Sequence, residues 1–299
     1  MSLRILAAAL LLTASPLALV PPALAQSAAA SATESPNAEL AAFFEEVDAA
    51  NLAASPQGKA YRGIRDGDYG RWNDPSDAAA IADFERGQKA LATLKARLDP
   101  AKLSSADRLS YRLFEYQAER AARAHPFRRN EYIFDQMNGA QSQMPAFLIN
   151  IHRVANQSDA NAYVMRLNGM GPRLDGLIAE SKSQSDMGVM PPKWVYPFVI
   201  DDARNVIKGA PFDDGAPSTL LADLTKKVEA LDIAASEKAG LIEAGRQALL
   251  TSVKPAYQRL IAEMERQQAI APTDDGIWRL KDGAAYYAER LANYTTTDL

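Results

Sequence analysis

The stretch DANAYVMRLNGMGPRLDGLI, residues 159–178, decides the class of fold because it carries a long helical pattern. Asp159 is a suitable N-cap, and apolar side chains recur behind it at helical spacing. These side chains are Tyr163, Leu167, Leu174 and Leu177. Pro172 has no backbone N–H, and its ring clashes with the carbonyl group four residues earlier. We therefore expect the helix to kink or break near Asn168.

Helical patterns flank this stretch on both sides. They cover residues 38–47, 75–98, 105–124, 144–154, 193–207, 218–231, 234–268 and 284–293. The pair 75–98 and 105–124 is expected to form a helical hairpin, with Asp74 as the N-cap of its first helix. The apolar stripe of the second helix is Leu109, Leu113, Tyr116 and Ala121. The expected fold is mainly α, an irregular multi-helix array with helical hairpins and at most a short strand near residues 277–280.

The N-terminal residues predict export. Arg4 precedes an apolar run, and Ala23-Leu24-Ala25 fits the small-x-small pattern of a cleavage site. Prolines within and after the run argue against a membrane anchor, and no later segment has the roughly 18 apolar residues of a spanning helix. We expect a signal peptide over residues 1–25, a flexible leader over 26–37, and a periplasmic or secreted protein with no membrane partner after cleavage.

Composition excludes several chemistries. The chain of 299 residues has no Cys and two His, with 47% hydrophobic residues and a net charge of -4. Without Cys there is no disulfide, iron–sulfur cluster, thiolate zinc site or Cys nucleophile. A net negative charge gives no basic surface for nucleic acid. Neither His125 nor His152 begins an H-E-x-x-H motif, and no P-loop or G-x-S-x-G motif is present. We therefore assign no catalytic residue and no metal ligand.

An aromatic cluster near the C-terminal end is the one candidate binding feature. Tyr286 and Tyr287, with Tyr294 beyond them, follow the expected strand. Tyr hydroxyl groups at such a position could bind substrate or stabilise an oxyanion. Core packing with the hydroxyl groups at the rim is the alternative interpretation. We assign Tyr286 and Tyr287 as candidate substrate-binding residues.

Several segments resemble domain-of-unknown-function family 885. The clearest is DGAAYYA at residues 282–288, followed by YTTT at 294–297. Met144-Pro145, Arg166-Leu167, GVMPP at 188–192 and VKPAY at 253–257 are also similar to that family. The resemblance runs from about Leu40 to the end of the chain. The ordered set is more specific than any one of these segments.

Members of that family are longer, often exported from bacteria, and resemble gluzincin-type zinc metallopeptidases with the zinc segment in the second half. The resemblance implies that residues 38–299 are the helical N-terminal portion of a larger metallopeptidase-like domain. This portion would form one wall of a cleft for a peptide-like substrate and be inactive alone. It would hold no cofactor, with zinc expected only in the missing C-terminal half. The residues TTTDL at 295–299 are typical of a helix start, which also predicts a chain incomplete at its C-terminus.

Two alternatives stay open. The chain could be a self-contained periplasmic helical module that binds or scaffolds without enzymatic activity, which the lack of catalytic motifs favours. An enzyme that uses only carboxylates is disfavoured because no carboxylate pair stands out in the sequence. The residues of this chain therefore do not decide whether it belongs to an enzyme.

Overall fold

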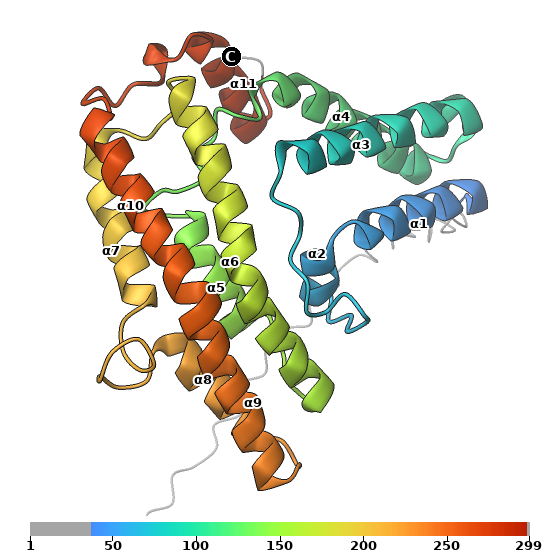
Figure 1. Cartoon of the computed structure of the whole chain (residues 1–299). Coiled ribbons are helices and arrows are strands. Elements are labelled where there is room, and N and C mark those ends of the chain that lie inside the picture. Colours follow the sequence, from blue (N-terminus) through green and yellow to red (C-terminus); the bar gives the residue numbers. More distant parts are fainter. Residues whose placement is uncertain (1–36, 298–299) are drawn as a thin grey trace, which may run out of the picture. The chain divides into compact units, whose positions relative to one another are not determined.

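The computed structural model describes residues 37–297, and these residues form a helical array (Figure 1). Within this part of the chain the only β-type pairing is a single bridge between Ala210 and Pro217. The expected mainly α class is therefore confirmed. The predicted signal peptide and residues 26–36 of the predicted leader lie outside the described residues.

The helices and short helical turns follow one another along the chain with brief connections. In order they are α1 (Ala38–Ala53), α2 (Pro56–Tyr61), α3 (Asp77–Arg97), η1 (Pro100–Lys102), α4 (Ser105–Ala124), η2 (His125–Phe127), α5 (Ala140–Asn150), α6 (Gln157–Asp186), η3 (Lys193–Val195), α7 (Tyr196–Val206), α8 (Thr219–Glu229), α9 (Ala235–Ala248), η4 (Leu249–Val253), α10 (Lys254–Ile270), η5 (Ile277–Arg279) and α11 (Gly283–Thr295).

Side-chain caps begin several helices, though not always at the expected residue. Asn37, which the sequence assigned to the leader, caps α1 by accepting from the N–H of Leu40 at 2.9 Å. The N-cap of α3 is Ser76, because Asp74 instead accepts from the N–H of Ser76 in a local turn. Caps of this kind explain why helix existence is easier to predict than the first residue.

The long helix α6 runs through Pro172 without a break, so of the two outcomes expected near Asn168, a kink or a break, the break is wrong. Pro172 leaves the carbonyl of Asn168 without its helical N–H. The hydroxyl of Ser252 donates to that carbonyl at 2.7 Å and accepts from the N–H of Gly171 at 3.2 Å. A donor from another helix thus replaces the missing helical bond. Ser252 lies in η4, a π-helical turn directly before α10.

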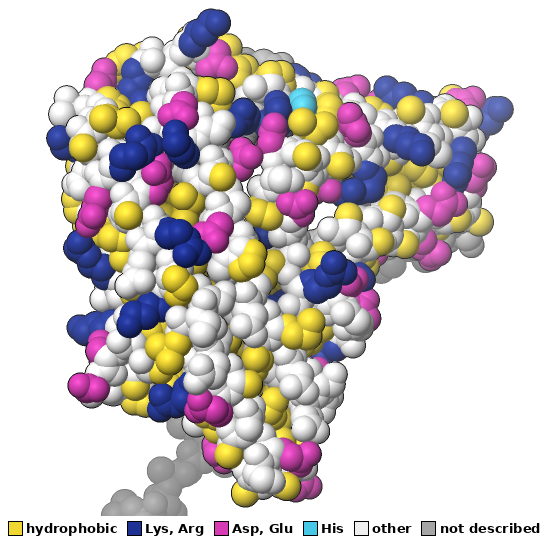
Figure 2. All heavy atoms as spheres, viewed as in Figure 1, with side chains coloured by type: hydrophobic (Ala, Val, Ile, Leu, Met, Phe, Trp, Pro, Cys, Tyr) yellow, Lys and Arg dark blue, Asp and Glu magenta, His cyan; other side chains and the backbone are white. Residues whose placement is uncertain are grey.

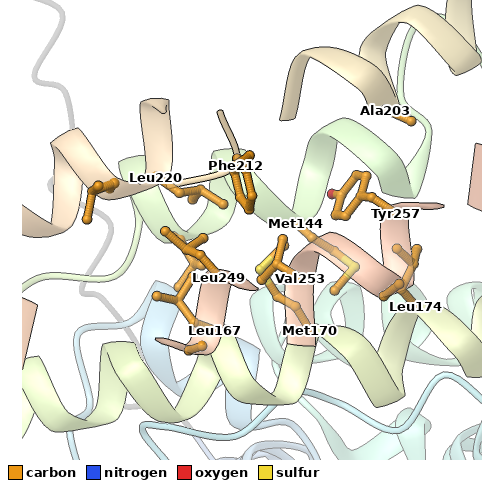
Figure 3. Packing of buried hydrophobic residues seen from close by; sticks show 14 of the residues in the cluster. Met144, Leu167, Met170, Leu174, Ala203, Phe212, Leu220, Leu249, Val253 and Tyr257 are labelled. Atoms are coloured by element: carbon orange, nitrogen blue, oxygen red, sulfur yellow. The ribbon is translucent and has the colours of Figure 1, made fainter. Parts of the chain in front are cut away.

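The main core surrounds α6, which lies beside α10, and α10 in turn lies beside α7 (Figure 1). Side chains from several helices meet in this core (Figure 3). Those labelled there include Met144, Leu167, Met170, Leu174, Val253 and Tyr257. The buried hydroxyl of Tyr257 donates to the carbonyl of Gln141 at 2.6 Å, which ties α10 to α5.

The structure differs from the sequence pattern in two places. Residues 277–279 form the 3₁₀ turn η5 rather than part of a strand, with the N–H of Leu280, the C-cap, bonded to the carbonyl of Ile277 at 3.0 Å. On α4 the apolar stripe faces solvent: Leu109 is 60% exposed, Leu113 50% and Tyr116 39%. The buried side chains of α4 are Tyr111 and Ala118, on the face that packs against α3.

An unusual buried cation lies where the segment after α2 meets α6. The guanidinium of Arg166 is fully buried, and within the described residues none of its nitrogens has a hydrogen-bond partner. It lies over the rings of Phe147, Tyr69 and Trp72, at 4.5, 5.4 and 5.5 Å from the ring centroids. Burial lowers the pKa of Arg166 to about 10, which still leaves it charged at neutral pH. Cation–π attraction therefore stabilises this group where hydrogen bonds do not.

His152 extends the same cluster. Its ring stacks on Tyr69 with centroids 4.4 Å apart, and its Nε2 lies 3.0 Å from the carbonyl oxygen of Asp159. Burial, with a smaller effect of Arg166, lowers the pKa of His152 to about 4. The imidazole is therefore neutral in the native protein at neutral pH.

The surface mixes both signs of charge. Figure 2 shows Lys and Arg side chains interspersed with Asp and Glu over the visible face. Across residues 37–297, we find no helix with the length and apolar character needed to cross a bilayer.

We expect Gly171→Ala to destabilise the protein by about 1–3 kcal/mol, as overpacking of a tight core does. A Cβ at residue 171 would lie 2.5 Å from Ser252 Oγ and 3.1 Å from its carbonyl oxygen. Gly240→Ala is the matched control, because Gly240 is exposed on α9 and a Cβ there would have no atom from the rest of the protein within 4 Å. That change should stabilise by about 0.5–1 kcal/mol. Urea unfolding measures both, and equal effects would contradict the close contact at residue 171.

We expect the protein to lose stability as the pH falls from about 6.5 to 4, in part through His152. Its pKa is about 4 when folded and 6.5 otherwise, so in this range the unfolded chain binds a proton that the native protein does not. A difference of that size corresponds to about 3 kcal/mol at most. His152→Gln should flatten this part of the pH dependence of the unfolding free energy, and His125→Gln should retain it. An identical slope for wild type and His152→Gln would show that His152 is not buried as a neutral group.

Candidate functional site

Helix α11 carries the predicted tyrosines, and a close contact sets where it begins. Gly283 is its first residue, and a Cβ there would lie 2.0 Å from the carbonyl oxygen of Ile277. Only glycine lets the helix begin this close to η5. The N–H of Tyr286 then bonds to the carbonyl of Asp282 at 2.9 Å, which completes the first turn.

The two predicted binding tyrosines have different surroundings. Tyr286 is 7% exposed and packs with Val189 and Leu280, its ring 5.7 Å from that of Phe127. Tyr287 is 57% exposed, because the next residue on a helix points about 100° away. The core-packing interpretation thus fits Tyr286, whose ring is mostly buried. It does not fit Tyr287, which is exposed to solvent.

Tyr286 nevertheless reaches a pocket of about 610 Å³, whereas Tyr287 does not line it. Helix α11 contributes Tyr286, Arg290 and Tyr294, one row at four-residue spacing. Other side chains around the pocket come from the 130–138 loop, from η3 and from the segment before η5. Among them are Glu131, Tyr132, Asp135, Trp194 and Asp275.

Ion pairs and hydrogen bonds hold this pocket's charged side chains. Arg290 pairs with Glu131 at 2.7 Å and donates to the hydroxyl of Tyr294 at 3.1 Å, while also lying over the Tyr294 ring. The indole N–H of Trp194 donates to Asp275 at 3.1 Å. The Arg290–Glu131 pair links the 130–138 loop to α11. The Trp194 side chain keeps aromatic surface open to solvent, since this residue is 49% exposed.

The Tyr286 hydroxyl is suited to donate a hydrogen bond. Burial raises the pKa of Tyr286 to about 12, so the group stays protonated at neutral pH. Within residues 37–297 this hydroxyl has no hydrogen-bond partner in the protein. Tyr132 also lines the pocket, and its hydroxyl accepts from Arg279 at 2.8 Å. The pocket can therefore offer donors and aromatic faces to a polar ligand.

The donor set for a metal is lacking in this part of the protein. Over residues 37–297, no three His, Asp or Glu side chains come together in a way that could hold an ion. His152 is buried against Tyr69 and Tyr163, so its imidazole is not open to a metal ion from solvent. The residues described here do not fit a zinc ion, and we derive no hydrolytic step from them.

Comparison with known proteins identifies the family. The sequence of residues 56–299 matches the family described as bacterial protein of unknown function (DUF885). The chain belongs to this family. No curated protein matches the sequence.

The fold also matches a solved structure. The crystal structure of the "putative lipoprotein" from Colwellia psychrerythraea is similar with a TM-score of 0.71 at 18% sequence identity. The match covers 87% of this chain and 46% of that one, so this chain spans less than half of that protein's length. At this identity the likeness describes the fold alone.

Sequence reasoning missed most of the pocket. Arg290 could have been found from its four-residue spacing after Tyr286, which places both on one face of a helix. Trp194, Asp275 and Tyr132 could not have been found in this way, because they come from separate segments that meet only in the folded protein.

We expect Tyr286→Ala to destabilise the protein by about 3 kcal/mol, as large-to-small changes in a core do. Tyr287→Ala is the matched control and should change stability by no more than about 0.5 kcal/mol. Tyr286→Phe should be nearly neutral, because the hydroxyl has no protein partner among the described residues. Urea unfolding with a far-UV signal measures all three. Equal losses for Tyr286→Ala and Tyr287→Ala would contradict the difference in burial.

Proposed function

We propose that the chain is the helical N-terminal part of an exported, metallopeptidase-like protein, and that the pocket at Tyr286 is one wall of its cleft for a peptide-like substrate. The observation that carries the proposal is this pocket, where Tyr286, whose protonated hydroxyl has no partner within residues 37–297, shares the lining with Arg290 and the half-exposed Trp194. A peptide carbonyl group can accept from the hydroxyl, and an apolar side chain can pack on the indole ring.

Family membership and the partial coverage of the similar structure support the proposal. In a protein of this kind the zinc and the groups that cleave the peptide bond would come from residues outside 37–297. The role of the described residues is then to bind and orient the substrate. The predicted export, which rests on residues 1–25, belongs to the same proposal.

Peptide binding to the purified chain tests the role of the pocket. The probe is a mixture of pentapeptides that are acetylated at one end and amidated at the other, so they carry no terminal charge. We expect them to quench the fluorescence of Trp194, and a Trp194→Phe variant to lose that signal. Tyr286→Phe should weaken the affinity about three- to tenfold, the cost of one lost hydrogen bond. Tyr287→Phe should bind as the wild type does.

Two results would count against the proposal. Equal affinities for wild type and Tyr286→Phe, with no response of Trp194, would show that the pocket does not bind peptides. Peptidase activity of this chain alone that a chelator abolishes would show that the catalytic groups lie within it.

A further inference from the structure

A second hollow lies on another face of α11, where this helix meets α4. It has a volume of about 630 Å³. Helix α11 lines it with residues 288, 289, 292 and 293, and Thr296 follows directly after the helix, whereas the Tyr286 pocket uses the row 286–290–294. From the α4 side come Tyr116, Arg120 and Arg123, with Phe127 beyond them. We call this hollow the α4–α11 groove.

The two arginines of the groove are available to a ligand. Within residues 37–297 neither Arg120 nor Arg123 takes part in a salt bridge or hydrogen bond, in contrast to Arg290 of the Tyr286 pocket. Arg120 is held by its own helix, since its guanidinium lies 5.7 Å from the centroid of the Tyr116 ring one turn earlier. Arg123 is three residues further on, so both cations face the same hollow. Two convergent guanidinium groups are a typical site for a carboxylate or phosphate.

The opposite wall carries one acceptor. Glu289 lines the groove from α11, and its Oε2 is enclosed without a hydrogen-bond partner in the described part of the chain. The other carboxylate oxygen, Oε1, is not enclosed, so a ligand in the groove that donates an N–H to it would be favoured. A multiply charged phosphate would meet repulsion from the same group. The groove therefore favours a ligand with one negative charge and a donor beside it.

An exposed apolar row leads into the groove along α4. Leu109, Leu113 and Tyr116 lie at helical spacing and continue into Arg120 and Arg123. From residue 109 to residue 123 a helix rises about 21 Å. An extended chain spans that distance with about six residues.

We infer that the α4–α11 groove binds the free C-terminus of a peptide with apolar final residues. The arginines take the terminal carboxylate, the last peptide N–H groups can donate toward Glu289, and the preceding side chains lie along Leu113 and Leu109. A membrane surface is the less suitable partner, because the arginines line a hollow that also contains a carboxylate. The inference does not rest on the proposed function, since it concerns a different face of α11.

The test compares two forms of one peptide on the purified chain. A hexapeptide that ends in leucine and phenylalanine carries fluorescein at its N-terminus and is made as the free acid and as the amide. Fluorescence polarisation gives both affinities. We expect the acid to bind at least about tenfold more tightly, the gain of a charge-assisted bidentate contact. Benzoate, a small carboxylate without a peptide chain, should compete only at far higher concentration.

Variants assign the preference to the groove. The double change Arg120→Met and Arg123→Met should make the acid and the amide bind equally. Arg112→Met is the matched control, because Arg112 is exposed on α4 but does not line the groove, and it should retain the preference. Thermal unfolding should be the same for all of them, since these side chains lie at the surface.

Several results would overturn the inference. They are equal binding of acid and amide by the wild type, a preference that persists in the double variant, and competition by benzoate as strong as that of the peptide acid. Cosedimentation with phosphatidylglycerol vesicles that depends on Arg120 and Arg123, without a preference for the acid, would instead identify a lipid surface as the partner. The peptides for the Tyr286 pocket carry no carboxylate, so a failure of either test leaves the other interpretable.

Discussion

The contact between Ser252 and the proline turn of α6 is the constraint on which the core depends. A proline within a helix leaves one carbonyl group without a donor and usually bends the helix. Here the Ser252 hydroxyl satisfies the Asn168 carbonyl and the adjacent Gly171 N–H together. Because α6 continues beyond Pro172, Leu167 and Leu174 on either side of it both reach the same core. One hydroxyl group from η4 thus allows a single helix to contribute core side chains on both sides of Pro172.

That contact also shows why the fold could be predicted only in part from the sequence. Helical spacing correctly predicted that most elements exist and are helical, because the spacing depends on residues that are close in sequence. Whether Pro172 breaks its helix depends on Ser252, which is eighty residues away and carries no local signal. The π-helical turn that presents Ser252 is likewise not visible in the pattern around Pro255. Local rules fail here because the missing bond is made by a distant residue.

The differences between pattern and structure at residues 277–280 and on α4 have related causes. The short segment Ile277-Trp278-Arg279-Leu280 fits a strand or a tight turn equally well, and because residues 37–297 form no strand for it to pair with, η5 bonds within itself. On α4 the stripe of Leu109 and Leu113 is a genuine apolar face, but α3 packs against Tyr111 and Ala118 instead. Amphipathic spacing indicates that a face is apolar; it does not determine which element, if any, covers it. This apolar face lies next to Arg120 and Arg123, which have no partner within residues 37–297, and the proposed peptide site combines the two.

Both candidate surfaces depend on how α11 is attached. The helix begins against the carbonyl of Ile277, is tied by Arg290 to Glu131, and packs through Tyr286 on Phe127. Phe127 lines the α4–α11 groove, whereas Tyr286 lines the other pocket, so this one ring pair separates the two hollows. A change that moves α11 must therefore alter both surfaces together, whereas a change in Arg120 or in the Tyr286 hydroxyl alters only one. For this reason the two binding roles can be separated by substitutions at the rims of the hollows and not by substitutions at Gly283 or Phe127.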